Sequence, residues 1–128
     1  MSANEDRTLP VQARVKLVLC ADERFFGPGV CELLELIRET GSIQAAAGRM
    51  KMSYTKAWRI LNRAEEAMGV QLIHRVSGGR NGGSSSLTPA GERAVTAFRS
   101  MEERLNEAGD ALLRDCRDIF FPKEGEAR

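Results

Sequence analysis

The sequence has 128 residues, of which 42% are hydrophobic and 29% charged, and its formal net charge is +1. This length suits one modest globular core, and no apolar run reaches the roughly 20 residues of a membrane span. The N-terminal stretch MSANEDRTLP lacks the pattern of a secretion signal. Three widely spaced cysteines and a single histidine argue against a disulfide framework and a structural zinc site. We therefore expect a cytoplasmic protein without a membrane segment or a bound metal.

The small net charge hides an uneven distribution. Residues 1–40 and 94–128 each carry two more acidic than basic side chains. Residues 41–93 carry eight Lys and Arg against three Asp and Glu, a net charge of +5. A concentrated basic region is the electrostatic footprint of a protein that binds a polyanion.

The N-terminal third predicts a short hairpin followed by a helix. Residues 1–13 are polar and expected to be disordered, whereas Arg14–Cys20 alternates and is rich in Val and Leu, which predicts a strand with Arg24–Phe26 as a short partner. The GPG at 27–29 starts a helix that Gly41 ends. Its apolar residues follow helical spacing at Val30, Leu33, Leu34 and Ile37.

Two N-cap serines then predict a pair of consecutive helices. Ser42 precedes a short helix with small apolar residues, and Ser53 precedes a longer helix that runs to about Met68. Small residues on the first helix would let the second approach closely. Two capped helices joined by a tight turn describe a helix-turn-helix.

The remaining chain predicts a wing and a long helix. Gln71–Val76 favours a strand, SGGRNGGSS a loop and Ser86–Thr88 the returning strand, while Thr88 and Pro89 start a final helix. We expect a mainly α fold with a small β component. Its parts are a winged helix-turn-helix domain at 14–87, a C-terminal dimerisation helix at 88–121 and a disordered tail at 122–128.

The exposed face of the helix after Ser53 is the best candidate for a functional surface. In a helix-turn-helix, its N-terminal half would lie in the DNA major groove, where Lys and Arg bond guanine or phosphate and Asn bonds adenine. The simpler interpretation is a solvated helix face, but the neighbouring wing and the clustered charge favour DNA. The candidate DNA-binding residues are Ser53, Tyr54, Thr55, Lys56, Arg59, Asn62, Arg63 and, in the wing, Arg80 and Asn81.

Three details of this surface stay open. Tyr54 either places its hydroxyl on a phosphate or covers the turn, and Trp58 packs between helices or, less favourably, stacks on a base. The glycine-rich loop is a wing tip or a flexible linker. Gly78 and Gly83 have the spacing of a nucleotide-binding loop, but Ser84 stands where that motif needs lysine.

The sequence offers no set of a nucleophile and a base, so we expect no catalytic residues, no cofactor and no enzymatic activity.

Ordered motifs across residues 14–115 resemble a known family. They are GSI-x-AA at 41–46, MSY-x-x-AW at 52–58, the double glycines at 78–83 and LT-x-x-G at 87–91. In this order they resemble the DNA-binding domain of the molybdate-responsive ModE regulators, a domain similar to that of LysR regulators. The resemblance implies a winged-helix homodimer with a recognition helix at Ser53–Arg63 and a wing at Ser77–Ser85.

Two departures from the ModE pattern stand out. Lys51 occupies a turn position where relatives usually have glycine, so a left-handed conformation there would be strained. Fuller ModE proteins continue into molybdate-binding domains that these 128 residues do not contain. We therefore expect no molybdate binding by this chain, with a separate oxyanion sensor as one route to regulation.

The last helix carries an apolar seam. From Ala94 its apolar positions step by four and three residues as far as Leu112, and Asp115 breaks the repeat. This seam either folds back on its own domain or pairs two copies, which would demand a palindromic operator. A helical adaptor that binds another protein through the seam is the alternative to a DNA-binding regulator. The residues expected at the dimer contact are Phe98, Met101, Leu105 and Leu112.

Overall fold

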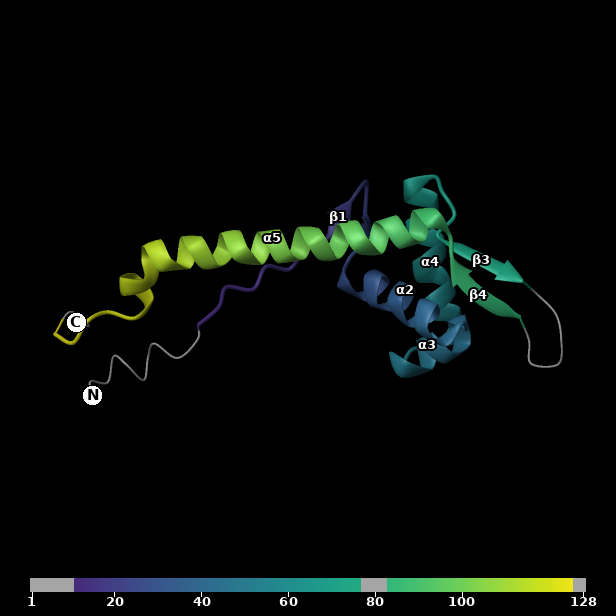
Figure 1. Cartoon of the computed structure of the whole chain (residues 1–128), viewed down its shortest axis with the longest axis horizontal. Coiled ribbons are helices and arrows are strands. Elements are labelled where there is room, and N and C mark those ends of the chain that lie inside the picture. The colour runs from purple at the N-terminus through teal and green to yellow at the C-terminus, as the bar shows by residue number, and fades with distance from the viewer. Residues whose placement is uncertain (1–10, 77–82, 126–128) are drawn as a thin grey trace. The chain divides into compact units, whose positions relative to one another are not determined.

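The computed structural model describes residues 11–76 and 83–125, which form two compact units. One unit comprises Leu17–Arg99, and the other combines the N-terminal residues up to Lys16 with the chain from Ser100 onward. The long helix α5 (Pro89–Phe120) contributes its first part to the former unit and the rest to the latter (Figure 1). Within the described residues, none of the helices combines the length and the apolar character that a membrane span requires.

The unit Leu17–Arg99 begins with a very short hairpin. Strands β1 (Leu19–Cys20) and β2 (Arg24–Phe26) pair antiparallel, with Leu19 opposite Phe26. The predicted strand β2 is confirmed, whereas the predicted strand at Arg14–Cys20 is too long. Because β2 offers only three residues and the register shifts after Leu19, residues before Leu19 lack a strand to pair with.

Helix α2 (Pro28–Thr40) forms as predicted. Pro28 stands in its first turn, and Gly41 ends it in a left-handed conformation, with φ of 74° and its N–H donated to the carbonyl of Ile37. Glycine adopts this conformation without strain, which explains the stop. The side chains of Leu33, Leu34 and Ile37 are fully buried.

Helices α3 (Ile43–Arg49) and α4 (Tyr54–Met68) confirm the helix-turn-helix. Ser42 Oγ accepts from the N–H of Ala45, and Ser53 Oγ accepts from the N–H of Lys56, as the cap signals predict. Helices α3 and α4 are in contact, and small buried residues on both would let them approach closely: Ala46, Ala47 and Ala57.

The turn between these helices contains one strained residue. Lys51 has a φ of 58°, and it is the one residue other than glycine with positive φ in the described chain. A side chain with a Cβ costs about 1–2 kcal/mol in the left-handed region. The strain expected from the departure at this position is therefore present.

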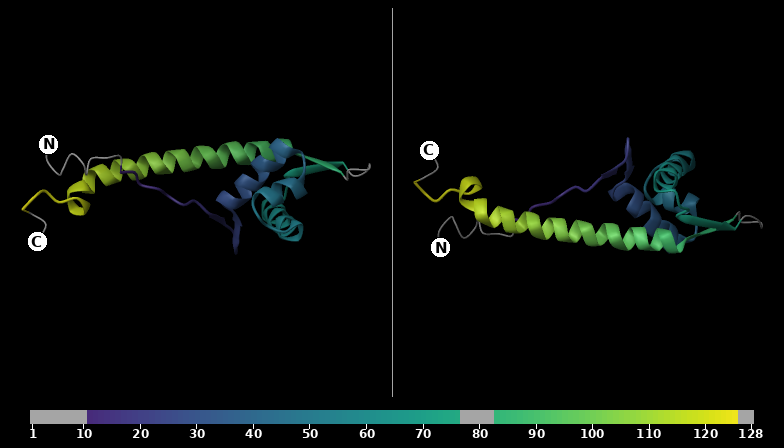
Figure 2. Two further views of the ribbon diagram at one scale, coloured as in Figure 1. Left: turned by 90° about the horizontal axis from the view of Figure 1, so that it is seen from below. Right: turned by 90° about the horizontal axis from the view of Figure 1, so that it is seen from above.

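The hairpin after α4 is the base of the wing. Gly69 ends α4 with φ of 71°, and strands β3 (Ile73–Val76) and β4 (Ser84–Leu87) then pair antiparallel with Ile73 opposite Leu87. Both strands are confirmed with shifted bounds: β3 begins two residues later than predicted and β4 two residues earlier, and β4 ends at Leu87 because Thr88 caps α5. Figures 1 and 2 show this hairpin projecting from the cluster of α2, α3 and α4. The loop that joins the strands, residues 77–82, lies outside the described residues.

The start of α5 packs closely against the base of the wing. Thr88 Oγ1 accepts from the N–H of Gly91, and a Cβ added to Gly91 would stand 2.4 Å from the carbonyl oxygen of Leu72. The glycine of the LT-x-x-G motif is thus required by close approach of two backbones.

An ion pair and an aromatic contact fix the first part of α5 to the domain. Arg99 donates from Nε and Nη2 to the two carboxylate oxygens of Glu35 at 3.1 and 2.7 Å. These hydrogen bonds hold the pKa of Glu35 below its ordinary value of 4.5, although partial burial opposes the shift.

Phe98 is 2% exposed, and its ring lies 5.2 Å from that of Phe26. The assignment of Phe98 to a dimer contact is therefore wrong. Phe98 is the last buried residue of α5, so the part of the seam up to this residue packs on its own domain.

In the other unit, an extended segment lies along α5. The N–H of Ala13 donates to Asp110 Oδ1, and that of Val15 donates to Asn106 Oδ1, both at 2.7 Å. Ala13 is held by this contact, so the disorder predicted up to residue 13 does not extend to it. Of the predicted tail at 122–128, residues 124–125 form a turn, and residues 126–128 lie outside the described chain. Large apolar side chains remain exposed along this part of α5: Met101, Leu112, Ile119 and Phe120.

Candidate nucleic-acid interface

Helix α4 divides into a buried and an exposed face. Ala57, Leu61 and Ala64 are buried in the core. The polar residues predicted to bind DNA lie on the exposed side of the same helix, so the structure places them where a ligand has access: Thr55, Lys56, Arg59, Asn62 and Arg63. Arg80 and Asn81, predicted for the wing, lie outside the described residues.

The exposed side of α4 forms a surface hollow of about 420 Å³. Its charges are the guanidinium groups of Arg59 and Arg63 against the carboxylate of Glu66. The hollow also offers a hydroxyl and an amide that donate and accept hydrogen bonds. Its lining residues are Thr55, Trp58, Arg59, Asn62, Arg63 and Glu66.

The start of the helix combines a cap with an exposed aromatic side chain. Ser53 Oγ accepts one hydrogen bond in the cap, so its O–H donor and one lone pair remain for a ligand. Tyr54 is 46% exposed, and its ring meets that of Trp58 edge to face at 6.3 Å. Trp58 is half-buried against the core, in agreement with the packing role predicted for it.

Trp58 also contacts a residue of the wing. The guanidinium carbon of Arg75 on β3 lies 4.0 Å from the centre of the Trp58 ring, a cation–π contact between the wing and α4.

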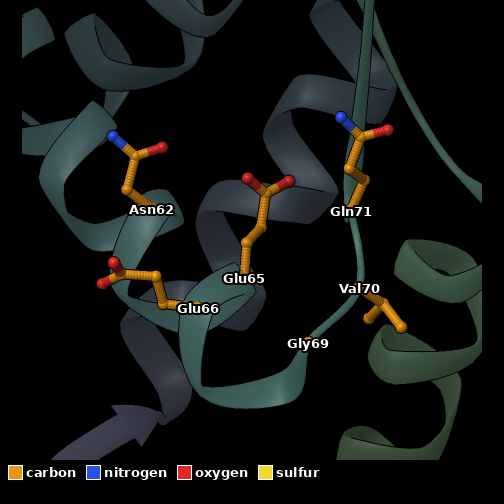
Figure 3. Close-up of a pocket in the computed structure, with 6 residues that line it drawn as sticks. All are labelled: Asn62, Glu65, Glu66, Gly69, Val70 and Gln71. Carbon is orange, nitrogen blue, oxygen red and sulfur yellow. The ribbon is translucent and has the colours of Figure 1, made fainter.

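Glu65 makes a second connection between α4 and the wing. Its Oε2 accepts from the N–H groups of Leu72, at 2.7 Å, and Ile73, at 3.2 Å. A second hollow, of about 680 Å³, lies beside it, and Figure 3 shows Glu65 between α4 and the segment that leads to Gln71. The Glu65 carboxylate is hydrogen-bonded to the backbone of the wing, and Glu66 lines the same hollow. These two negative charges make the hollow unsuited to an anion.

Two further hydrogen bonds hold the wing, one from β4 and one from the residue that follows β4. The N–H of Ser85 on β4 donates to the carbonyl of Gly41 at 2.8 Å, and Thr88 Oγ1 donates to the carbonyl of Gln71 at 2.6 Å. The base of the wing is therefore held by α2 and α4 together.

Sequence reasoning missed the roles of Glu65 and Arg75. Both belong to polar positions that a helical wheel or a strand alternation assigns to solvent. Their partners lie seven or more residues away, so only the tertiary arrangement reveals them. Within the described chain, no group of three or more His, Cys, Asp and Glu side chains is placed to hold a metal ion.

The fold and this surface define a winged helix-turn-helix domain. Residues 31–92 match the family of bacterial regulatory helix-turn-helix proteins of LysR type. A crystal structure of full-length CbnR with its target DNA is similar, with a TM-score of 0.50 and 25% sequence identity over 65% of this chain and 27% of that one.

More specific matches come from ModE proteins. The molybdenum transport protein ModE of Herbaspirillum seropedicae is 38% identical over 99 residues, which is 77% of this chain and 35% of that protein. The transcriptional regulator ModE of Yersinia pestis is 33% identical over 106 residues, 82% of this chain and 40% of the relative. The DNA-binding transcriptional dual regulator ModE of Escherichia coli K12 is 30% identical, with the same coverage.

Over most of its length the chain is therefore similar to the matched part of these ModE proteins, and residues 31–92 also match the LysR-type helix-turn-helix family. The chain spans 35–40% of the length of these relatives.

Proposed function

We propose that this chain is a sequence-specific DNA-binding regulator of transcription. The observation that carries the proposal is the exposed basic side of α4, at the position of a recognition helix: Lys56, Arg59 and Arg63 are exposed, and the two arginines line a hollow. The relatives named as transcriptional regulators and the CbnR–DNA complex support the same function. The N-terminal half of α4 would enter the major groove.

Base and phosphate contacts divide among the residues of this surface. Arg59, Arg63 and Asn62 have the hydrogen-bonding groups that read guanine and adenine edges. Tyr54, Thr55 and Lys56 stand in the first turn of α4 and Ser53 caps it, a place where contacts to the DNA backbone would fix the register.

We infer that the operator is palindromic and is bound by a homodimer. The exposed apolar residues Met101 and Leu112 and the half-buried Leu105 of α5 would meet a second copy. Burying a large apolar side chain contributes about 1.5–3 kcal/mol, so several together can offset the association entropy. Light scattering should give twice the 14.1 kDa of the chain, and a monomer at micromolar concentration would refute the dimer.

The test of the DNA-binding proposal is a titration of labelled genomic duplex fragments, followed by sequencing of those bound. Enrichment of a shared inverted repeat is expected. Absence of duplex binding at low salt, together with a stable protein complex in pull-down, would instead favour an adaptor.

We further propose that the chain acts in the cytoplasm, without a cofactor and without enzymatic activity. A separate oxyanion sensor is one route by which this function would be regulated. Calorimetry is expected to show no saturable molybdate binding by these 128 residues, and micromolar binding would overturn this part of the proposal.

A further inference from the structure

The contact between Arg75 and Trp58 places a cation at the border between the recognition helix and the wing. Trp58 lies on α4 and lines the hollow formed by the basic face. The Arg75 guanidinium lies 4.0 Å from the centre of the indole ring, and the ring of Tyr54 packs edge-on against the same indole. The charge of Arg75 therefore stands beside the surface formed by α4.

The backbone that carries Arg75 is held on both sides. Two residues before it, the N–H of Ile73 donates to the Glu65 carboxylate of α4. Its strand partner Ser85 donates to the carbonyl of Gly41 at the end of α2. A cation on such a backbone loses little conformational entropy when it binds, because its position is already fixed.

The contact with Trp58 leaves the N–H donors of Arg75 without a hydrogen-bond partner among the described residues. Guanidinium groups stack through their flat faces and donate hydrogen bonds in their plane. Arg38, Arg49 and Arg99 each form an ion pair with a glutamate. In residues 11–76 and 83–125, the exposed Arg75 has the Trp58 ring as its neighbour and forms no ion pair or hydrogen bond.

We propose that Arg75 binds a phosphate of the DNA backbone where the groove occupied by α4 meets the wing, with Trp58 as its platform. A planar donor fork matches a phosphodiester in a bidentate geometry. This inference rests on the proposed DNA-binding function, and it adds a contact outside the recognition helix and outside the wing tip.

The experiment compares Arg75→Ala, Arg75→Lys and the wild-type chain by fluorescence anisotropy on a mixed-sequence DNA duplex across a salt series. Arg75→Ala should weaken binding about 10- to 100-fold, the effect of one charged hydrogen-bonded contact. It should also reduce the slope of log affinity against log salt by about 0.9. Arg75→Lys keeps the charge and should retain the slope while recovering only part of the affinity.

The matched control is Arg24→Ala, which removes one exposed arginine from β2 of the same unit. Equal affinity and slope in Arg75→Ala and Arg24→Ala would overturn the inference. Loss confined to one base position of a selected operator, without a change in slope, would also overturn it by marking Arg75 as a base reader.

The single tryptophan allows a test without DNA. Emission of Trp58 should change in Arg75→Ala and stay unchanged in Arg24→Ala, and identical spectra in all three proteins would contradict the stack. If the wild-type chain fails to bind duplex at low salt, the proposed function fails. If it binds and only the Arg75 comparisons fail, this inference alone is wrong.

Discussion

Replacing Lys51 by glycine should stabilise the protein. Lys51 has φ of 58° in the turn between α3 and α4, and its side chain is exposed. Removing its Cβ relieves about 1–2 kcal/mol of left-handed strain. Glycine also gains freedom in the unfolded chain, which takes back about 0.5–1 kcal/mol. The expected net gain in the free energy of unfolding is about 0.5–1 kcal/mol.

Thermal and urea unfolding followed by circular dichroism measure this gain. It corresponds to a rise in Tm of about 2–8 °C for a domain of this size. Lys51→Ala is the matched control, since it removes the charge but keeps the Cβ and therefore the strain. Stability of Lys51→Gly no greater than that of Lys51→Ala would refute the strain argument.

Three further outcomes are expected. Gly91→Ala should unfold at clearly lower denaturant concentration, by about 1–3 kcal/mol, because its Cβ would meet the Leu72 carbonyl at 2.4 Å; an unchanged midpoint would contradict the close approach. The pKa of Glu35 is lowered by Arg99, so this pair stabilises the fold above the ordinary pKa of 4.5, and the stabilisation disappears as the pH falls through the lower folded value. Glu35→Gln should therefore be less stable than the wild type at neutral pH by about 0.2–1 kcal/mol, and it should lose less stability as the pH falls. The same loss of stability in acid as in the wild type would refute this. Leu112→Asp, at a side chain that is 66% exposed, should leave the fold intact in circular dichroism and shift light scattering from dimer to monomer; a retained dimer would exclude this contact.

The sequence predicts well those features that depend on short-range rules. Ser42 and Ser53 cap helices, and Gly41 and Gly69 end them, because each acts through neighbouring backbone groups. The exposed side of α4 follows in the same way from the helical period.

Where a feature depends on partners distant in the sequence, the prediction was wrong or the feature was missed. The predicted strand at Arg14–Cys20 has a hydrophobic pattern typical of a strand, but its pairing is limited by the three residues of β2. Phe98 continues the heptad spacing of the seam, yet Phe26 buries it within the domain. Spacing alone does not distinguish a seam that meets a second copy from one that meets its own core.

The candidate site shows the same division. The basic residues of α4 are readable from the sequence, whereas the links between α4 and the wing depend on a helix and a hairpin meeting in space. Glu65 and Arg75 are therefore visible only in the structure.

The central claim is that the basic side of α4 binds duplex DNA, and one salt-dependent titration tests it most directly. The wild-type chain and the Arg59→Ala, Arg63→Ala double variant are compared on the duplex fragments selected by the wild type, with circular dichroism to verify the fold. We predict that wild-type affinity falls steeply with salt, and that the double variant loses about 1–3 kcal/mol for each arginine that reads a base. Unchanged affinity in a correctly folded double variant would contradict the account.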